Sequence, residues 1–280
     1  MENLKLNLID RTKSDISWEI SKFPDGEVMI SLGEFSRKTN IDVICRIRSP
    51  KELFILMQVG DILKRHGMLW TLKIYYLMSA RMDRVMDFNK PYSLDIVSNI
   101  LKNLGAGLIQ IVEPHSEKVV HLIDPFSVEI VDKISDLGIS DFICYPDEGA
   151  AERYSGLKRH NTAIECRKTR TPEGKIMSVE FKDIVNLPRI KSTDVITIVD
   201  DLCDGGGTFL ALHKLLKNAY PGRKINLAVV HAVQEEGLIK VCKVFNKVTV
   251  TNSYKDWTYL QCNEFELENL EVIDIINEEE

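Results

Sequence analysis

The sequence predicts an α/β fold with two mostly parallel sheets, each flanked by helices. Short apolar segments rich in β-branched residues alternate with segments whose apolar residues recur at helical spacing. The polar clusters directly follow the apolar segments, as expected for parallel sheets, whose ligands bind beyond the carboxyl ends of the strands. The length of 280 residues suits one large or two medium domains.

Strands and helices are expected to alternate from residue 41 onward, each strand being a short apolar run and each helix a longer amphipathic one. The expected strands are 41–47, 72–78, 108–113, 141–146, 162–166, 195–200, 225–232 and 247–252, with a closing strand at 272–276. The expected helices are 50–66, 93–104, 148–159, 208–219 and 235–245.

Capping residues support two of these helices. Ser93 is expected to be the N-cap of helix 93–104, which stops before Gly105. Pro221 is expected to end helix 208–219.

The segment 120–127 contains Asp-Pro and few helix signals, so it is expected to connect two similar α/β halves. The N-terminal domain is then 1–125 and the C-terminal domain 126–264. The acidic tail 265–280 is expected to return to the N-terminal domain as its last strand.

The composition is that of a globular protein, with 44% hydrophobic and 28% charged residues. The net charge is −6 and there is no basic run, so no nucleic-acid partner is expected. The N-terminus is too polar for a signal peptide and no apolar run is long enough to span a membrane, which predicts a cytoplasmic protein. The six cysteines form no CxxC motif and are expected to be reduced core thiols.

The densest polar cluster of the chain lies in 196–216. An apolar run ends in adjacent carboxylates, and a glycine-rich loop then leads into a helical pattern. Such a loop lets backbone N–H groups converge on an anion at a helix N-terminus. The carboxylates suit ribose hydroxyls, a metal ion, or both. The cluster consists of Asp200, Asp201, Asp204, Gly205, Gly206, Gly207 and Thr208.

This segment closely resembles the fingerprint of the type I phosphoribosyltransferase superfamily. The resemblance implies that Asp200 and Asp201 hold the 2- and 3-hydroxyls of ribose, and that the loop from Asp204 to Thr208 binds its 5-phosphate. The superfamily includes transferases that consume phosphoribosyl pyrophosphate (PRPP) and the synthetases that make it. The fold it implies is two phosphoribosyltransferase-like domains.

From about residue 20 to residue 255, the order of further motifs resembles the PRPP synthetase (ribose-phosphate diphosphokinase) family. Its Phe-x-Asp-Gly-Glu element is matched by 23–27, and its Ala-Arg-Gln-Asp-Arg element by 80–84, with Met82 in place of Gln. Its histidine after a strand falls on His115, and its Ser-Pro-Asp-x-Gly element on 145–149. Its flexible Lys-x-Arg catalytic loop falls on Lys168 and Arg170.

The resemblance implies transfer of the β,γ-pyrophosphate of ATP to the anomeric hydroxyl of ribose 5-phosphate, with Mg²⁺, to give PRPP and AMP. Lys168, Arg170 and Asp204 are then the catalytic candidates, and His115 and Asp147 the candidates for metal binding. A homo-oligomer, dimer or hexamer, is also implied. The ATP-binding candidates are Phe23, Asp25, Glu27, Arg48, Arg81, Asp83 and His115.

The chain departs from the family pattern at three places. Gly205 replaces a threonine of the phosphate loop, which removes a hydroxyl donor and gains space. The segment 47–50 adds Arg48, and 84–93 lacks most of the positive charge that the family uses for assembly and for regulation by ADP or phosphate.

Two acceptors therefore remain open. One is ribose 5-phosphate. The other is a ribose whose 5-phosphate carries a further group, such as ADP-ribose, whose product would serve NAD synthesis. A non-catalytic regulatory homologue is a third alternative, but the retention of Lys168, Arg170, Asp147 and His115 argues against it.

Overall fold

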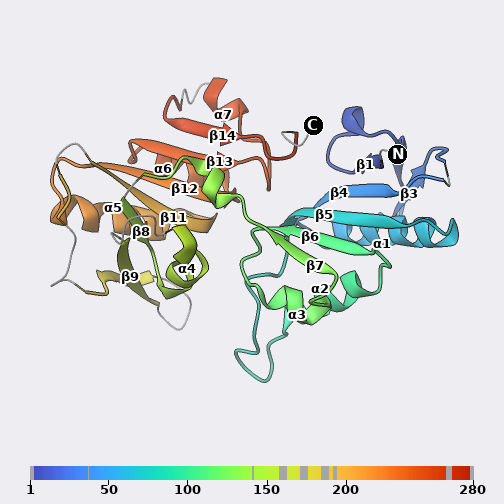
Figure 1. The fold of residues 1–280 in the computed structure, drawn as a ribbon, viewed down its shortest axis with the longest axis horizontal. Helices are drawn as coiled ribbons and strands as arrows, with labels where there is room; N and C mark the ends of the chain where they lie inside the picture. Colours follow the sequence, from blue (N-terminus) through green and yellow to red (C-terminus); the bar gives the residue numbers. More distant parts are fainter. Residues whose placement is uncertain are drawn as a thin grey trace. The chain divides into compact units, whose positions relative to one another are not determined.

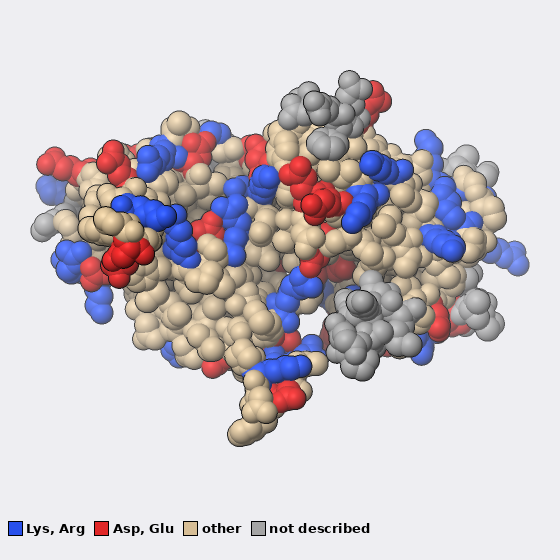
Figure 2. All heavy atoms as spheres, turned by 180° about the vertical axis from the view of Figure 1, so that it is seen from behind, with Lys and Arg blue, Asp and Glu red and all other residues tan. Residues whose placement is uncertain are grey.

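The computed structural model describes residues 3–36, 38–140, 142–157, 163–170, 176–183, 189–191, 194–262 and 267–277. The chain divides into two compact units, Met1–Asp132 (unit 1) and Lys133–Glu280 (unit 2), whose elements are shown in Figure 1. Each unit contains a sheet with helices packed on it, which confirms the predicted α/β class. On the face drawn in Figure 2, basic and acidic side chains are interspersed over both units.

The sheet of unit 1 has the strand order β1-β4-β5-β6-β7, and all of its neighbouring strands are parallel. An antiparallel hairpin of β2 and β3 accompanies it. The strands are β1 (Leu4–Asn7), β2 (Trp18–Lys22), β3 (Val28–Leu32), β4 (Ile41–Ile47), β5 (Trp70–Leu77), β6 (Leu108–Val112) and β7 (Val128–Val131). The helices are α1 (Pro50–Arg65), α2 (Ser93–Lys102) and α3 (Lys118–Ile123), with a 3₁₀ turn at Arg11–Lys13.

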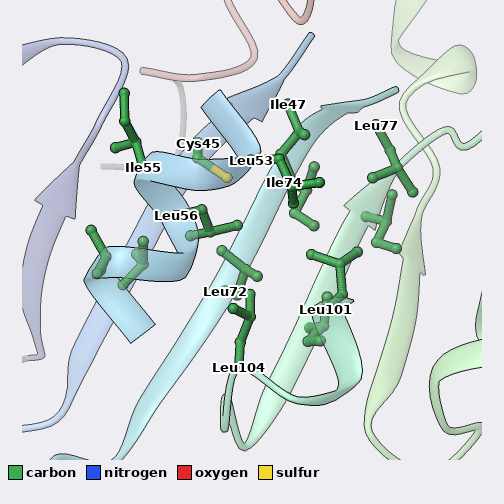
Figure 3. Close-up of a cluster of buried hydrophobic side chains, with 14 of the residues drawn as sticks. Cys45, Ile47, Leu53, Ile55, Leu56, Leu72, Ile74, Leu77, Leu101 and Leu104 are labelled. Atoms are coloured by element: carbon green, nitrogen blue, oxygen red, sulfur yellow. The ribbon is translucent and has the colours of Figure 1, made fainter. Parts of the chain in front are cut away.

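The helix α1 buries one apolar face against this sheet. It begins at Ser49, whose side chain accepts a hydrogen bond from the Glu52 N–H, and Pro50 occupies its first turn, where no N–H is needed. Leu53 and Leu56 point toward Leu72 and Ile74 of β5 in the core drawn in Figure 3. These side chains are 0–7% exposed, so they remove most of their apolar surface from water.

The sheet of unit 2 has the strand order β10-β9-β8-β11-β12-β13-β14, in which only β9 and β10 are antiparallel neighbours. The strands are β8 (Phe142–Tyr145), β9 (Ala163–Arg170), β10 (Ile176–Phe181), β11 (Val195–Cys203), β12 (Lys224–Ala232), β13 (Lys247–Thr251) and β14 (Leu270–Ile273). The helices are α4 (Glu148–Arg153), α5 (Gly207–Ala219), α6 (Glu235–Cys242) and α7 (Tyr259–Cys262), with 3₁₀ turns at Ile134–Leu137 and Ser155–Leu157.

Every strand expected between residues 41 and 252 is found, as are all five expected helices, although α4 and α6 are shorter than expected. The sequence analysis missed the edge and hairpin strands β1, β2, β3, β7 and β10 and the short helices α3 and α7. Ser93 is not the N-cap expected for α2. It is the first helical residue, after Tyr92, which makes no side-chain capping bond.

The domain boundary differs from the expected one. The segment expected to connect the halves contains α3, and β7 follows it and pairs with β6, so the division lies between Asp132 and Lys133. The expected return of the tail to the N-terminal domain was wrong for Leu270–Ile273, which forms β14 and pairs with β13 in unit 2. Among the described residues no helix is long and apolar enough to cross a membrane.

Replacement of Leu56 by alanine should lower the free energy of unfolding by about 2–5 kcal/mol, because it leaves a cavity in a closely packed core. Leu56 is 0% exposed, whereas Leu69, just before β5, is 75% exposed. Leu69→Ala is therefore the matched control and should change stability little. Denaturant unfolding of both variants tests the prediction, and equal losses would contradict the assigned core.

Candidate active site

The carboxyl ends of β8, β9 and β11 bring together charged side chains from three distant parts of the sequence. Asp147 follows β8 and caps α4, its Oδ1 accepting a hydrogen bond from the Ala150 N–H at 3.0 Å. Its Oδ2 forms an ion pair with the Nζ of Lys168 on β9. Asp147 and Lys168 therefore meet at one edge of the unit 2 sheet.

The neighbouring carboxylates at the end of β11 have different environments. Asp201 is 2% exposed, and its Oδ1 lies 2.6 Å from the Nη1 of Arg153 at the end of α4. Asp200 is half-buried, and its Oδ1 accepts the N–H of Asp201 at 3.0 Å. Asp201 is thus bound into the protein by an arginine, whereas Asp200 is the carboxylate better placed to meet a ligand.

The electrostatics of this cluster follow from three carboxylates facing two cations. Burial raises the pKa of Asp200 well above its ordinary value, and the nearby charges of Asp201 and Asp147 raise it further. Burial would also raise the pKa of Asp147, but the ion pair with Lys168 outweighs it, and that pKa lies below its ordinary value. The cluster therefore disfavours a third negative charge at Asp200, and a bound cation or a hydroxyl donor would stabilise the charged form of this carboxyl group.

The loop after β11 has the shape that its glycines predicted. Gly206 is the N-cap of α5 with φ +77°, a backbone conformation that favours glycine. The first N–H groups of α5, from Gly207 and Thr208 onward, have no partner within the helix and offer donors to an anion. Gly205 is exposed, and a Cβ built on it would meet no atom within 4 Å.

A glycine that the sequence analysis did not select supports this loop. A Cβ on Gly237 of α6 would lie 1.9 Å from the carbonyl oxygen of Asp204 and 2.9 Å from the Cα of Gly205. A Cβ on Gly206 would in turn lie 3.0 Å from the carbonyl oxygen of Gly237. The backbones of α6 and of the loop are therefore in direct contact. The only available signal was an isolated glycine inside a helical pattern, which indicates close packing.

The catalytic-loop candidates lie on a strand. The resemblance implies a flexible loop at Lys168 and Arg170, but β9 extends through Arg170 and pairs with β10 from Ile176. This pairing corrects the expectation of a flexible loop for Cys166–Arg170, because each of these residues has a partner on β10. The side chain of Arg170 and residues 171–175 lie outside the described part of the chain.

In unit 1, the candidate Asp83 contacts the segment after β6, which also contains the candidate His115. The Oδ2 of Asp83 accepts a hydrogen bond from Ser116 at 3.1 Å and lies 3.3 Å from the Nζ of Lys118. Burial would raise the pKa of Asp83, but hydrogen bonds from Arg84, Lys118 and Ser116 outweigh it and lower the pKa below its ordinary value. His115, next to Ser116, is half-buried.

The backbone at these two strand ends is strained. Ser79 after β5 has φ +67° and Glu113 after β6 has φ +41°, values that residues with a side chain seldom adopt. Glu113 is also a carboxylate that is only 4% exposed. Strained residues of this kind concentrate at ligand sites, so both positions support a site at this edge.

The other ATP-binding candidates lie on separate elements of unit 1. Phe23, Asp25 and Glu27 form the exposed turn between β2 and β3, where Gly26 has φ +99°. Arg48 follows β4 and pairs with Glu52 of α1 at 2.5 Å. Arg81 follows β5 and is exposed. Gln58 of α1 joins the hairpin to the unit by hydrogen bonds to Val28 and Ile30 of β3.

The side chains available as metal ligands can be compared with those that Mg²⁺ requires. Within the described residues, no group of three or more His, Cys, Asp and Glu side chains is arranged to hold a metal ion. Mg²⁺ is usually bound by one or two carboxylates together with substrate phosphates. The neighbouring carboxylates Asp147 and Asp200 fit a Mg²⁺ site of this kind, in which substrate phosphates supply the other ligands.

Comparisons with known proteins agree with the motifs. No protein-family model matches the chain. It is similar to the ribose-phosphate pyrophosphokinase of Pyrococcus furiosus, with 29% identity over 84% of this chain and 85% of that protein. It is also similar to the enzyme of that name from Sulfolobus acidocaldarius, with 27% identity over 83% of this chain and 81% of that protein.

The fold is that of the phosphoribosylpyrophosphate synthetase of Mycobacterium smegmatis. That crystal structure matches with a TM-score of 0.74 over 95% of this chain and 88% of the other, at 20% identity. Together with the curated relatives, it confirms the resemblance that the order of the motifs indicated.

Replacement of Gly237 by alanine should displace the loop after β11, because the new Cβ would overlap the carbonyl oxygen of Asp204. We expect binding of ribose 5-phosphate, the ligand that the resemblance implies, to weaken roughly tenfold or more in calorimetry, as when the donors of an anion site lose their geometry. Glu236→Ala, a change at the exposed neighbouring position, is the control. Unchanged affinity in Gly237→Ala would show that the loop does not depend on α6.

Proposed function

We propose that this chain is a ribose-phosphate pyrophosphokinase, which transfers the β,γ-pyrophosphate of ATP to the anomeric hydroxyl of a ribose 5-phosphate. One observation supports the proposal most strongly. At the carboxyl ends of the unit 2 strands, Asp147, Lys168 and Asp200 lie beside a glycine-rich loop and the N-terminus of α5. Relatives that share most of the chain have this name. The products are PRPP and AMP.

In the proposed reaction, the oxygen of the anomeric hydroxyl bonds to the β-phosphorus of ATP and loses its proton. The bond between the β-phosphorus and the oxygen that bridges to the α-phosphate breaks, and AMP leaves with its electron pair. Such transfer depends on in-line positioning and on neutralised charge more than on covalent catalysis. The protein therefore has to fix both substrates and place cations around the transferred group.

The residues of unit 2 fit the acceptor. The N–H groups at the start of α5, with Thr208 and the loop from Asp204, bind the 5-phosphate. Asp200 accepts hydrogen bonds from the ribose hydroxyls. Asp201 mainly positions its neighbour, since Arg153 already binds it and it is 2% exposed. This assigns different roles to two carboxylates that the sequence pattern treated alike.

Lys168 and Arg170 supply positive charge to the transferred group. Lys168 is held by Asp147 in this structure, so its ammonium stands at the same edge as Asp200. Asp147 and Asp200 would hold Mg²⁺ together with the substrate phosphates, and the ion would neutralise phosphate charge when bound. In unit 1, His115 is the metal-binding candidate that the motifs suggest. A bound cation would compete with Lys168 for the carboxylate of Asp147.

The residues of unit 1 are assigned to ATP. Phe23 stacks on the adenine, with Asp25 and Glu27 near its exocyclic edge, and Arg48, Arg81, Asp83 and His115 lie near the phosphates in this proposal. The support is the order of the motifs and the strained edge after β5 and β6. We also propose that the protein is cytoplasmic, as its sequence predicts, and a homo-oligomer, as the family resemblance implies.

A second candidate acceptor is favoured by Gly205. A Cβ at this position meets no atom within 4 Å, so the glycine is not required by contacts around its side-chain position. The open space at this position suits a ribose whose 5-phosphate carries a further group, as in ADP-ribose. Transfer to ADP-ribose would give ADP-ribose pyrophosphate.

The test of the proposal is an assay with ATP, Mg²⁺ and each acceptor in turn. Mass spectrometry should detect AMP together with a product heavier than the acceptor by one diphosphoryl group. Release of ADP and phosphate alone, or absence of product with both acceptors, would overturn the proposed function. A regulatory homologue would form no product with either acceptor but would still bind the substrates.

Lys168→Ala should lower kcat by two to three powers of ten, because one preorganised cation facing transition-state charge contributes about 3–4 kcal/mol. ATP binding without turnover should change much less. Lys182→Ala is the matched control, since Lys182 forms its ion pair with Glu165 and its side chain is 40% exposed. If binding and kcat fall equally in Lys168→Ala, the lysine only holds substrate.

Gly205→Thr should raise the preference for ribose 5-phosphate over ADP-ribose. The hydroxyl adds a hydrogen bond to a phosphate dianion, which contributes about 1.5–3 kcal/mol, and its methyl group fills the space that a substituent needs. The readout is kcat/KM for both acceptors in both proteins. If the parent ignores ADP-ribose and the variant treats ribose 5-phosphate as before, the extended acceptor is excluded.

A further inference from the structure

Three parallel strands of unit 2 end side by side next to the phosphate loop. The strands β11, β12 and β13 are paired in that order. The loop from Asp204 to Gly206 follows the first, Val233–Gln234 the second, and residues 252–258 the third. Because the carboxyl ends of parallel strands share one edge, the three loops border the same side of the sheet, roughly 4.8 Å apart from strand to strand.

A cluster of three side chains, Glu235, Lys255 and Tyr259, lies on the second and third of these connections. The Nζ of Lys255 donates to the Tyr259 hydroxyl at 2.8 Å and lies 3.5 Å from Oε2 of Glu235. The Tyr259 hydroxyl donates to the same carboxylate oxygen. The lysine Nζ also lies 4.7 Å from the ring centroids of both Trp257 and Tyr259.

These side chains are fixed although they reach the surface. The side chains of Lys255 and Glu235 are 44% and 39% exposed. The indole of Trp257 beneath them is 1% exposed and donates to the Ala232 carbonyl at 3.2 Å. The hydrogen bond with Tyr259 raises the pKa of Lys255 and lowers that of Glu235, so both are charged near neutrality. A surface cluster held this way loses little entropy when it meets a ligand.

The cluster is joined to the phosphate loop through α6. Glu235 is the first residue of that helix, and Gly237 packs its backbone against Asp204 and Gly205. Two strand spacings, roughly 10 Å, separate β11 from β13. This distance is comparable to the span of a phosphate linkage and a pentose attached to the 5-phosphate of ribose.

We propose that Glu235, Lys255 and Tyr259 form a subsite for the distal nucleoside of an acceptor whose ribose carries a diphosphate-linked nucleoside at its 5-position. The inference rests on the proposed function, since the phosphate loop must hold the phosphate next to the reacting ribose. Glu235 and Lys255 offset each other in charge, so the subsite suits an uncharged nucleoside better than a phosphate. Tyr259 offers a ring for base stacking, and Glu235 an acceptor for ribose hydroxyls.

The experiment compares kcat/KM for ADP-ribose and for ribose 5-phosphate in the parent, Tyr259→Leu and Tyr259→Phe. Tyr259→Leu should lower the value for ADP-ribose roughly tenfold, the usual loss of base stacking on an aromatic ring, and leave ribose 5-phosphate within about twofold. Tyr259→Phe keeps the aromatic ring, so its kcat/KM for ADP-ribose should fall less. Phe126→Leu, at a 96% exposed position of unit 1, is the matched control.

Failure of the subsite and failure of the proposed function give different results. If ribose 5-phosphate is converted and Tyr259→Leu leaves the ratio of the two acceptors unchanged, the subsite is wrong and the function stands. If neither acceptor is converted, the function is wrong, and calorimetry with ADP-ribose decides the subsite. Weaker binding of ADP-ribose to Tyr259→Leu than to the parent then supports the subsite. Equal binding by the two proteins, or no binding by either, overturns it. If Tyr259→Leu does not fold, Glu235→Gln takes its place in both measurements.

Discussion

The close approach of α6 to the loop after β11 is the contact on which the unit 2 site depends. A phosphate site made of backbone N–H groups works only if the loop has a fixed shape, because the donors cannot adjust independently. Here two glycines allow backbone to meet backbone: Gly206 turns with φ +77° and Gly237 lies against Asp204. The helix α6 thereby supports the loop, and α5 begins with its first N–H groups directed away from the helix.

A second constraint is the crowding of carboxylates at this edge. Asp147, Asp200 and Asp201 lie close enough to raise the pKa of Asp200, so the edge is stable only because Arg153 and Lys168 neutralise two of them. The arrangement holds Lys168 beside the place where phosphate charge is expected. It also leaves Asp200 as the group whose charge a ligand or cation would stabilise, which links the electrostatics of the resting protein to its proposed chemistry.

The sequence predicted the repeating strands and helices because each buries an apolar pattern of a definite period. It also predicted the loop of Asp204 to Thr208, since glycine and carboxylates at a strand end have few structural uses. It did not predict that Lys168 lies on a strand, because the pairing of β9 with β10 is set by a partner strand rather than by local pattern. The roles of Arg153 and Gly237 were missed for a similar reason, since each depends on a neighbour far away in sequence.

The three glycines of the phosphate loop differ in what the structure requires of them. Gly206 needs its positive φ and the absence of a Cβ, and Gly207 opens α5. Gly205 is different: its Cα lies against Gly237, but its Cβ position points into open space and its backbone is not left-handed. A side chain there would cost no packing. Because neither a left-handed backbone nor close packing requires this glycine, we attribute it to the ligand: under the proposed function, the missing side chain leaves room beside the 5-phosphate.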